Sequence, residues 1–186
     1  MSDDDMICRP LRQMARNALL SNRRLDIACM ALAPGEWEAP RISFFPSLKE
    51  TMVHLLNADR WYADMIRGSR PGIPVAEGNR ATPTDFASER ATVDGWMVAF
   101  CEDLSASELS REIINHWPDR TFTETLADTL LHVFLHGQHH RGQIHAMLAG
   151  SSVAPPQLDE FIQANVPDLR APDLAALGWD EAWLTR

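Results

Sequence analysis

The chain contains very little lysine and no cluster of basic residues. Lys49 is its one lysine, so the 17 basic residues are otherwise arginines, and 26 acidic residues bring the formal net charge to −9. Proteins that bind nucleic acids or anionic membranes use a basic patch to contact phosphate groups. We therefore expect neither nucleic acid nor a membrane as a partner.

Long apolar runs are missing too. No stretch approaches the roughly 18 apolar residues that a transmembrane helix needs. Residues 1–5 are acidic, whereas a secretory signal would begin with basic residues. Cys8, Cys29 and Cys101 lie far apart and form no CxxC pair, which is typical of reduced thiols. Together these features predict a cytoplasmic protein.

Three common catalytic motifs do not occur in the sequence. It contains no HExxH, no GxSxG and no P-loop, which excludes a zincin and gives no sign of a serine nucleophile or a phosphate-binding loop. Cys29 and Cys101 fall on apolar helix faces, so we expect them to pack in the core and not to react.

Helical periodicity dominates what the sequence does contain. Its length suits one ordinary domain, and 45% hydrophobic with 23% charged residues is the composition of a globular protein. Apolar residues recur at steps of three and four over four long segments. We expect helices over residues 11–32, 48–67, 83–104 and 122–148.

Hydroxyl side chains mark three of the predicted helix starts. Ser47 precedes Glu50 by three residues and Thr121 precedes Glu124 by three, which is the spacing of a capping box. Thr82 is followed directly by a proline, as at many helix N-termini.

The predicted fold is an all-α four-helix bundle over residues 1–166. Residues 111–117 form a short irregular or β-like segment before the fourth helix, with a turn at 118–119. The Gly- and Pro-rich loop 69–81 is long enough to allow a departure from up-and-down topology. An extended C-terminal tail, 167–186, is expected to pack on the bundle or on a partner, because its tryptophans are costly to expose.

Histidine is concentrated in one segment. Five of the seven histidines lie between His132 and His145. Because His132, His136 and His140 are spaced by four, they project side by side from one helix, and two such imidazoles can hold one metal ion. On a helical wheel His140 lies about 40° from the core direction, His136 about 80° and His132 about 120°. The pair His136 and His140 therefore flanks the core and faces a cleft.

His54 is the natural third ligand, since it lies on the flank of the second apolar stripe. Three neutral imidazoles leave one coordination position open, as in catalytic sites, and they suit zinc, nickel, copper or iron. The alternative is that these histidines are ordinary packing or solvated residues, as most histidines on helices are. We expect His139 and His145 to be of that ordinary kind.

Two segments make the sequence resemble a known family. The first, Phe44 to Trp61, reads FFPSLKETMVHLLNADRW, and the second, 132–143, reads HVFLHGQHHRGQ. With a histidine on the second helix and HxxxHRGQ on the fourth, the chain is similar to the DinB-like family, also called DinB/YfiT-like metalloenzymes. The resemblance covers about residues 10–161.

The resemblance implies a four-helix bundle in which His54, His136 and His140 bind one metal ion. The chain departs from the family at Leu135, where a polar residue is common. Some relatives are thiol transferases that use bacillithiol or mycothiol, and one of these is a maleylpyruvate isomerase.

From these features we expect a metal-dependent enzyme that acts on a small molecule. Zn²⁺ or Ni²⁺ would lower the pKa of a low-molecular-weight thiol, as in a thiol S-transferase, or of water, as in a hydrolase. One alternative is a non-catalytic or stress-related metal-binding bundle. Another is a purely structural bundle without a metal.

Asp59 is predicted to be buried, which is unusual for a carboxylate. It lies within about 20° of the core direction of the second helix, and Arg141 lies about 60° from that of the fourth. We expect Asp59 to pair with Arg141, or with another arginine such as Arg12 or Arg16, unless the second helix is rotated and Asp59 is solvated. Asp59, Arg141 and His132 are also the candidates for residues that support the metal ligands.

Leu131 and Leu135 are predicted on the outer face of the fourth helix, about 140° and 180° from its core direction. Two exposed leucines one turn apart suggest that something covers them. One candidate is the C-terminal tail, in which Trp179 and Trp183 would form one apolar face. The other is the second subunit of a homodimer.

Overall fold

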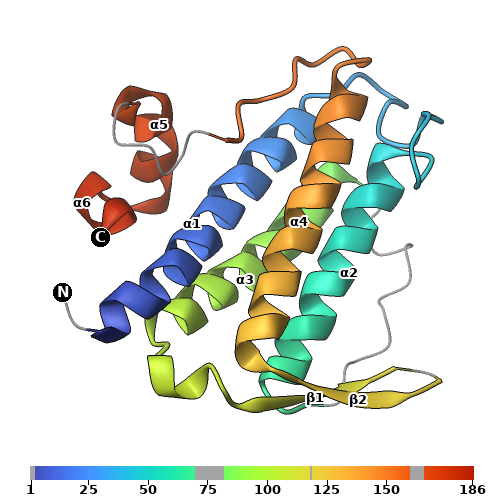
Figure 1. Cartoon of the computed structure of the whole chain (residues 1–186). Helices are drawn as coiled ribbons and strands as arrows, with labels where there is room; N and C mark the ends of the chain where they lie inside the picture. Colours follow the sequence, from blue (N-terminus) through green and yellow to red (C-terminus); the bar gives the residue numbers. More distant parts are fainter. Residues whose placement is uncertain (1–2, 70–81, 118, 160–165) are drawn as a thin grey trace.

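The computed structural model describes residues 3–69, 82–117, 119–159 and 166–186, and it is a helical bundle (Figure 1). Its long helices are α1 (Asp3–Met30), α2 (Leu48–Ile66), α3 (Pro83–Glu102) and α4 (Leu126–Leu148). Shorter elements are the 3₁₀ helix η2 (Ala106–Glu108), the strands β1 (Glu112–His116) and β2 (Thr121–Thr125), and the helices α5 (Pro167–Leu177) and α6 (Glu181–Thr185). The predicted all-α bundle with a short β-like segment before the fourth helix is confirmed.

Two predicted helix starts are confirmed by their caps. The Ser47 hydroxyl accepts a hydrogen bond from the backbone N–H of Glu50 at 3.1 Å, and Thr82 accepts one from that of Asp85 at 3.2 Å. Each bond satisfies one of the N–H groups that a helix leaves free in its first turn. Just beyond α2, Gly68 takes a positive φ of 74°, which reverses the chain at little steric cost.

The predicted start of the fourth helix is too early. Thr121–Thr125 is a strand, antiparallel to β1, and α4 begins after it. The cap is Thr125, whose side chain accepts from the backbone N–H of Asp128 at 3.1 Å. The spacing of Thr121 and Glu124 imitates a capping box, but β-branched threonines at alternating positions favour the strand.

Helices α2 and α3 run in the same direction, so the bundle departs from up-and-down topology, as the long connection allows (Figure 1). Asp59 pairs with Arg90, and about two turns later the Arg67 guanidinium lies over the Trp96 ring at 4.1 Å. Contacts that advance together along both helices require parallel axes. Some predicted segments lie wholly or partly outside the described residues, namely the loop 69–81, the turn 118–119 and the short segment 158–163.

The core is made by all four long helices. One buried cluster near the β hairpin includes Leu130 and Phe134 of α4, and a second near the other end includes Leu56 and Leu148. Cys8, Cys29 and Cys101 are free and buried, as expected of core thiols, and burial raises the pKa of the Cys29 and Cys101 thiols to about 12. Within the described ranges, no helix combines the length and apolarity needed to cross a membrane.

The C-terminal tail is helical where an extended segment was predicted. Pro167 begins α5, Gly178 ends it in the left-handed conformation, and Asp180 caps α6. Proline at a helix start and glycine at its end are common helix signals, so Pro167 and Gly178 already indicate this helix in the sequence.

The tail packs on α1, beside the bundle (Figure 1). The buried Arg16 guanidinium donates hydrogen bonds to the carbonyl oxygens of Leu184 and Arg186 at 3.0 and 3.1 Å. Leu131 and Leu135 of α4 remain 54% and 61% exposed. The idea that the tail covers these leucines is therefore wrong.

Candidate metal centre

Three histidines from two helices come together between α2 and α4. His54 lies in the second turn of α2, and His136 and His140 lie one turn apart in the middle of α4. One ring nitrogen from each fits within a group whose members are all within 4.8 Å of one another. The Nε2 atoms of His54 and His136 are 3.2 Å apart. Nitrogen ligands about 2.1 Å from a tetrahedral ion are separated by about 3.4 Å, so this donor set fits a divalent ion such as zinc.

Burial of the histidines follows the order that the helical wheel predicts. His140 is 5% exposed and His136 is partly buried, while His132 and His139 are exposed. The flank of a buried helix face is where a side chain reaches a cleft without crossing the apolar core. The same position on α2 leaves His54 partly buried.

Phe45 covers two of the three rings. Its ring centroid lies 4.4 Å from that of His54 and 5.9 Å from that of His140. Phe44 meets Phe45 edge-on at 4.9 Å and is itself 81% exposed. Phe45 therefore shields the cluster from water on one side and stiffens the two imidazoles by packing.

All three histidines are held in the neutral form. Burial lowers the pKa of His54, His136 and His140, and that of His136 falls to about 4. The proximity of the other rings lowers it further, because two imidazolium ions this close repel each other. Neutral imidazoles have a free lone pair at physiological pH, which is the state that binds a metal ion.

Gln143 orients His140 from the same helix. His140 Nδ1–H donates to Gln143 Oε1 at 2.8 Å, and the amide N–H of Gln143 donates to His139 Nε2 at 3.0 Å. Because an amide oxygen only accepts, this bond places the proton on Nδ1 and leaves Nε2 of His140 free to ligate. Such bonds to the remote ring nitrogen raise the affinity of histidine sites for metals.

Among the candidates for supporting residues, His132 makes a ring contact with the cluster. Its ring lies 5.9 Å from that of His136, nearly parallel to it, and 5.1 Å from Tyr62 of α2. His132 does not belong to the group of three convergent donors. Asp59 lies behind the histidines, where its charge favours the protonated form of both His54 and His140.

Asp59 is buried and meets an arginine, as predicted, but the arginine is not one of those named from the sequence. It is 8% exposed and pairs with Arg90 of α3 instead of Arg141, Arg12 or Arg16. Arg90 was not named because only α1 and α4 were considered, whereas the parallel path of α3 alongside α2 brings Arg90 to the same level.

Arg90 and Asp59 belong to a buried polar network that joins all four helices. Asp94 accepts from the Asn22 amide at 3.0 and 3.1 Å and lies 3.5 Å from Arg90 Nη1. Arg141 reaches Asn22 Oδ1 at 3.4 Å. The two buried guanidiniums thus lie among carboxylates and amides, as buried charges must.

Gly137 of α4 makes room for this network. A Cβ atom at Gly137 would lie 2.9 Å from Nη1 of Arg141. Arg141 is 2% exposed, so its guanidinium has little space to move away. Gly137, the first of the two glycines in the segment 136–143, therefore leaves space for the side chain of Arg141, one turn later.

Arg90 and Asp94 were not predicted from the sequence, although their positions carry a signal. Both lie on the apolar stripe of α3, since Arg90 follows Phe86 by four residues and Asp94 follows Arg90 by four. A charged side chain on this stripe must point into the core. The role of Gln143 in holding His140 was missed as well, although Gln143 follows His140 by three residues and therefore lies beside it on the helix.

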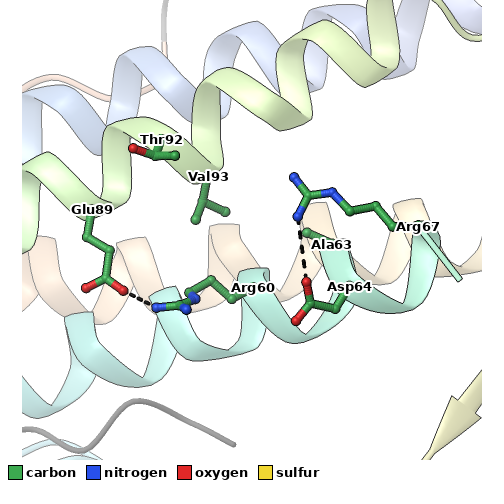
Figure 2. A pocket seen from close by; sticks show the side chains of 7 residues that line it. All are labelled: Arg60, Ala63, Asp64, Arg67, Glu89, Thr92 and Val93. Atoms are coloured by element: carbon green, nitrogen blue, oxygen red, sulfur yellow. Dashed lines mark hydrogen bonds and ion pairs between the residues drawn. The ribbon is translucent and has the colours of Figure 1, made fainter. Parts of the chain in front are cut away.

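A pocket of about 280 Å³ between α2 and α3 is a poorer candidate for a functional site (Figure 2). Its charged side chains are paired with each other: Arg60 with Glu89 across the helices, and Arg67 with Asp64 at 3.6 Å along α2. Its lining includes none of the three convergent histidines. The histidine cluster remains the centre with donors that point at a common position.

A bundle with a three-histidine cluster between its second and fourth helices is the architecture that the resemblance implies. The chain belongs to the DinB family, whose model matches residues 1–169. No curated protein matches the chain significantly. Family membership and the histidine cluster are both compatible with metal binding.

Proposed function

We propose that this protein is a divalent-metal-dependent enzyme, with His54, His136 and His140 as the ligands of Zn²⁺ or Ni²⁺. The observation that carries the proposal is the convergence of three neutral imidazoles from two helices. Three protein ligands leave a coordination position for a small molecule, whereas structural zinc sites normally have four.

The residues around the cluster suit this role. The three imidazoles hold the ion, Gln143 fixes the tautomer of His140, and Phe45 excludes water from one side. Bound there, a divalent ion supplies Lewis-acid chemistry, which lowers the pKa of a thiol or water molecule at the open position. With a low-molecular-weight thiol the activity is S-transfer to an electrophilic small molecule, and with water it is hydrolysis.

Metal analysis of protein purified without a histidine tag tests the site. We expect about one divalent ion per chain, and we expect His54→Ala and His136→Ala each to lose it. His145→Ala is the matched control, since His145 lies on α4 outside the cluster. Retention of the ion by both ligand variants would contradict the site.

Turnover separates the enzyme from a non-catalytic metal-binding bundle. The assay combines the metal-loaded protein with a thiol and an electrophile, and in parallel with a panel of ester and amide substrates. Thiol consumption that needs both metal and His136 supports S-transfer, and metal-dependent hydrolysis supports the second activity. Full metal occupancy without either turnover favours the non-catalytic bundle.

We also propose a cytoplasmic homodimer. The free cysteines are those of a protein from a reducing compartment. Leu131 and Leu135 lie on the exposed face of α4, which continues with Gly142 and Ala146 and carries no carboxylate, lysine or arginine beyond its first turn. For a chain with a net charge of −9, such a face is where two copies approach with the least repulsion.

A further inference from the structure

A groove on the other side of the molecule, between α1 and α3, has a carboxylate at its base. Its cavity of about 150 Å³ is separate from the histidine cluster, which lies between α2 and α4. Asp26 of α1 and Asp94 of α3 supply its acidic groups. The walls are largely apolar and include Leu19, Ile27, Met30 and, from α5, Leu177.

Asp26 is buried without a partner. It is 6% exposed, and its Oδ1 atom is fully buried with no hydrogen-bond donor. In the described part of the chain, Asp26 forms neither a hydrogen bond nor an ion pair, whereas the neighbouring Asp94 accepts from Asn22 and faces Arg90. A buried carboxylate normally has two or more donors, so this one has unused capacity for hydrogen bonds.

Carboxylates outnumber guanidiniums among the buried groups behind the groove. The central network contains two buried guanidiniums, Arg90 and Arg141, and two buried carboxylates, Asp59 and Asp94. Asp26 adds a third carboxylate beside them. A buried carboxylate without a hydrogen-bond donor is costly in its charged form, and it is neutralised by a proton or stabilised by a cation.

Arg23 also lines the groove, and its Nε atom has no hydrogen-bond partner, because Asp173 is held more closely by Arg24, at 2.8 Å. Its Nε atom lies 3.7 Å from Asp173 of α5, and 36% of its side chain is exposed. Arg23 and Arg90 both lower the pKa of Asp26, while Asp94 and above all burial raise it, with a net result of about 7. Near neutral pH the carboxyl group of Asp26 is therefore easily ionised by a ligand that compensates its charge.

We propose that the groove between α1 and α3 binds a small organic ammonium ion, with its charged head on Asp26 and its aliphatic part against Ile27, Met30 and Leu177. An apolar cavity of about 150 Å³ is large enough for a benzene-sized molecule, which corresponds to an amine of about five or six heavy atoms. A metal ion fits poorly, since the lining has no oxygen-bearing side chain besides Asp26 and Asp94, and metal ions such as Ca²⁺ take six or more oxygen ligands.

Titration with n-butylammonium, followed by amide chemical shifts, tests the proposal, with n-butanol as the neutral analogue of the same shape. We expect saturable binding of the amine, with amide shifts in α1 and α3. Binding of n-butanol should be about 10- to 100-fold weaker, because a hydrogen bond to a charged group contributes a factor of this size. Asp26→Asn should weaken amine binding by a similar factor. Arg23→Gln should strengthen it, because a like charge is removed from the mouth of the groove.

The outcome does not depend on the histidine cluster, so His136→Ala should bind the amine as the wild type does. If Asp26→Asn does not fold, the carboxyl carbon shift of Asp26 in the wild-type protein replaces it, and the amine should lower the pH at which that shift titrates. Equal binding of amine and alcohol, an amine affinity unchanged by Asp26→Asn, or no saturable binding would overturn the proposal and leave Asp26 as a protonated acid.

Discussion

Gln143 holds His140 through Nδ1, the ring nitrogen that would face away from an ion bound at the proposed site. Replacing Gln143 by leucine removes this bond without removing a ligand, so we expect metal affinity to fall by about 10- to 100-fold, as for other residues that orient metal-binding histidines. Competition with a chromophoric chelator measures the affinity.

Two variants make the effect of Gln143→Leu interpretable. Gln143→Glu keeps an acceptor for His140 Nδ1–H and should retain most of the affinity. Gln138→Leu removes a glutamine of the same helix that is exposed and contacts Arg141 at 3.4 Å instead of a histidine. An equal loss in all three variants would mean that Gln143 acts through helix stability alone.

Asp26 makes folding stability depend on pH. Burial raises its pKa from 3.8 to about 7, so the folded chain binds a proton that the unfolded chain releases at lower pH. The stability contributed by this proton is complete below pH 4 and is lost as the pH rises through about 7. We therefore expect Asp26→Asn to be more stable than wild type at pH 8 by about 2–4 kcal/mol, and similar to it at pH 4.

Urea unfolding of both proteins at the two pH values measures this difference. At pH 8, saturating n-butylammonium should restore part of the stability that the wild type has lost, because the ligand compensates the charge of Asp26 in place of the proton. A stability difference that is the same at pH 4 and pH 8 would show that Asp26 does not titrate in this range.

At the scale of the helix, the pair of Asp59 and Arg90 connects α2 to α3. Asp59→Ala removes the closer of the two carboxylates that face the Arg90 guanidinium, which is 1% exposed, so we expect a loss of about 3–5 kcal/mol. Asp64→Ala is the matched change on the same helix, where the carboxylate meets Arg67 nearer the surface. It should cost no more than about 1 kcal/mol. Chemical denaturation measures the free energy of unfolding of both variants. If Asp59→Ala and Asp64→Ala lose the same amount, the pair of Asp59 and Arg90 is solvated in solution.

Two glycines of α4 offer a sharper comparison. A methyl group at Gly142 meets no atom within 4 Å, whereas one at Gly137 meets the buried Arg141 guanidinium at 2.9 Å. Gly142→Ala should stabilise the protein by up to about 1 kcal/mol through helix propensity. Gly137→Ala should instead lose about 1–3 kcal/mol, the usual cost of overpacking. Thermal melts of the two variants should therefore shift in opposite directions.

The elements that the sequence predicts well are those with strong local signals. Apolar periodicity and the caps at Ser47 and Thr82 define the helices, and the wheel orders the histidines by burial. The start of α4 was misjudged because Thr121–Thr125 satisfies a local capping pattern, while pairing with β1 decides the outcome. Arg90 as the partner of Asp59 depends on how α3 lies beside α2, and this is a property of tertiary packing that single-helix patterns do not contain.

At the scale of the whole molecule, the exposed face of α4 bears on assembly. Leu135 is 61% exposed at the middle of that face, so Leu135→Glu would place a charge in the proposed dimer interface. We expect this variant to sediment as a monomer and the wild type as a dimer. Leu169→Glu is a suitable control, since Leu169 is 51% exposed on α5, away from α4. A wild-type monomer with both leucines in water would exclude the dimer.

The histidine cluster also ties together distant parts of the chain. His54 and His136 are 82 residues apart in sequence, and the connection between them includes all of α3 and the β hairpin. An ion shared by these side chains acts as a removable cross-link that closes a loop of this length, and the unfolded chain has no preformed equivalent. At about one hundred times its dissociation constant, it would add about 2.7 kcal/mol to the stability of the fold. The melting temperature of the bundle would then report how much metal is available to it.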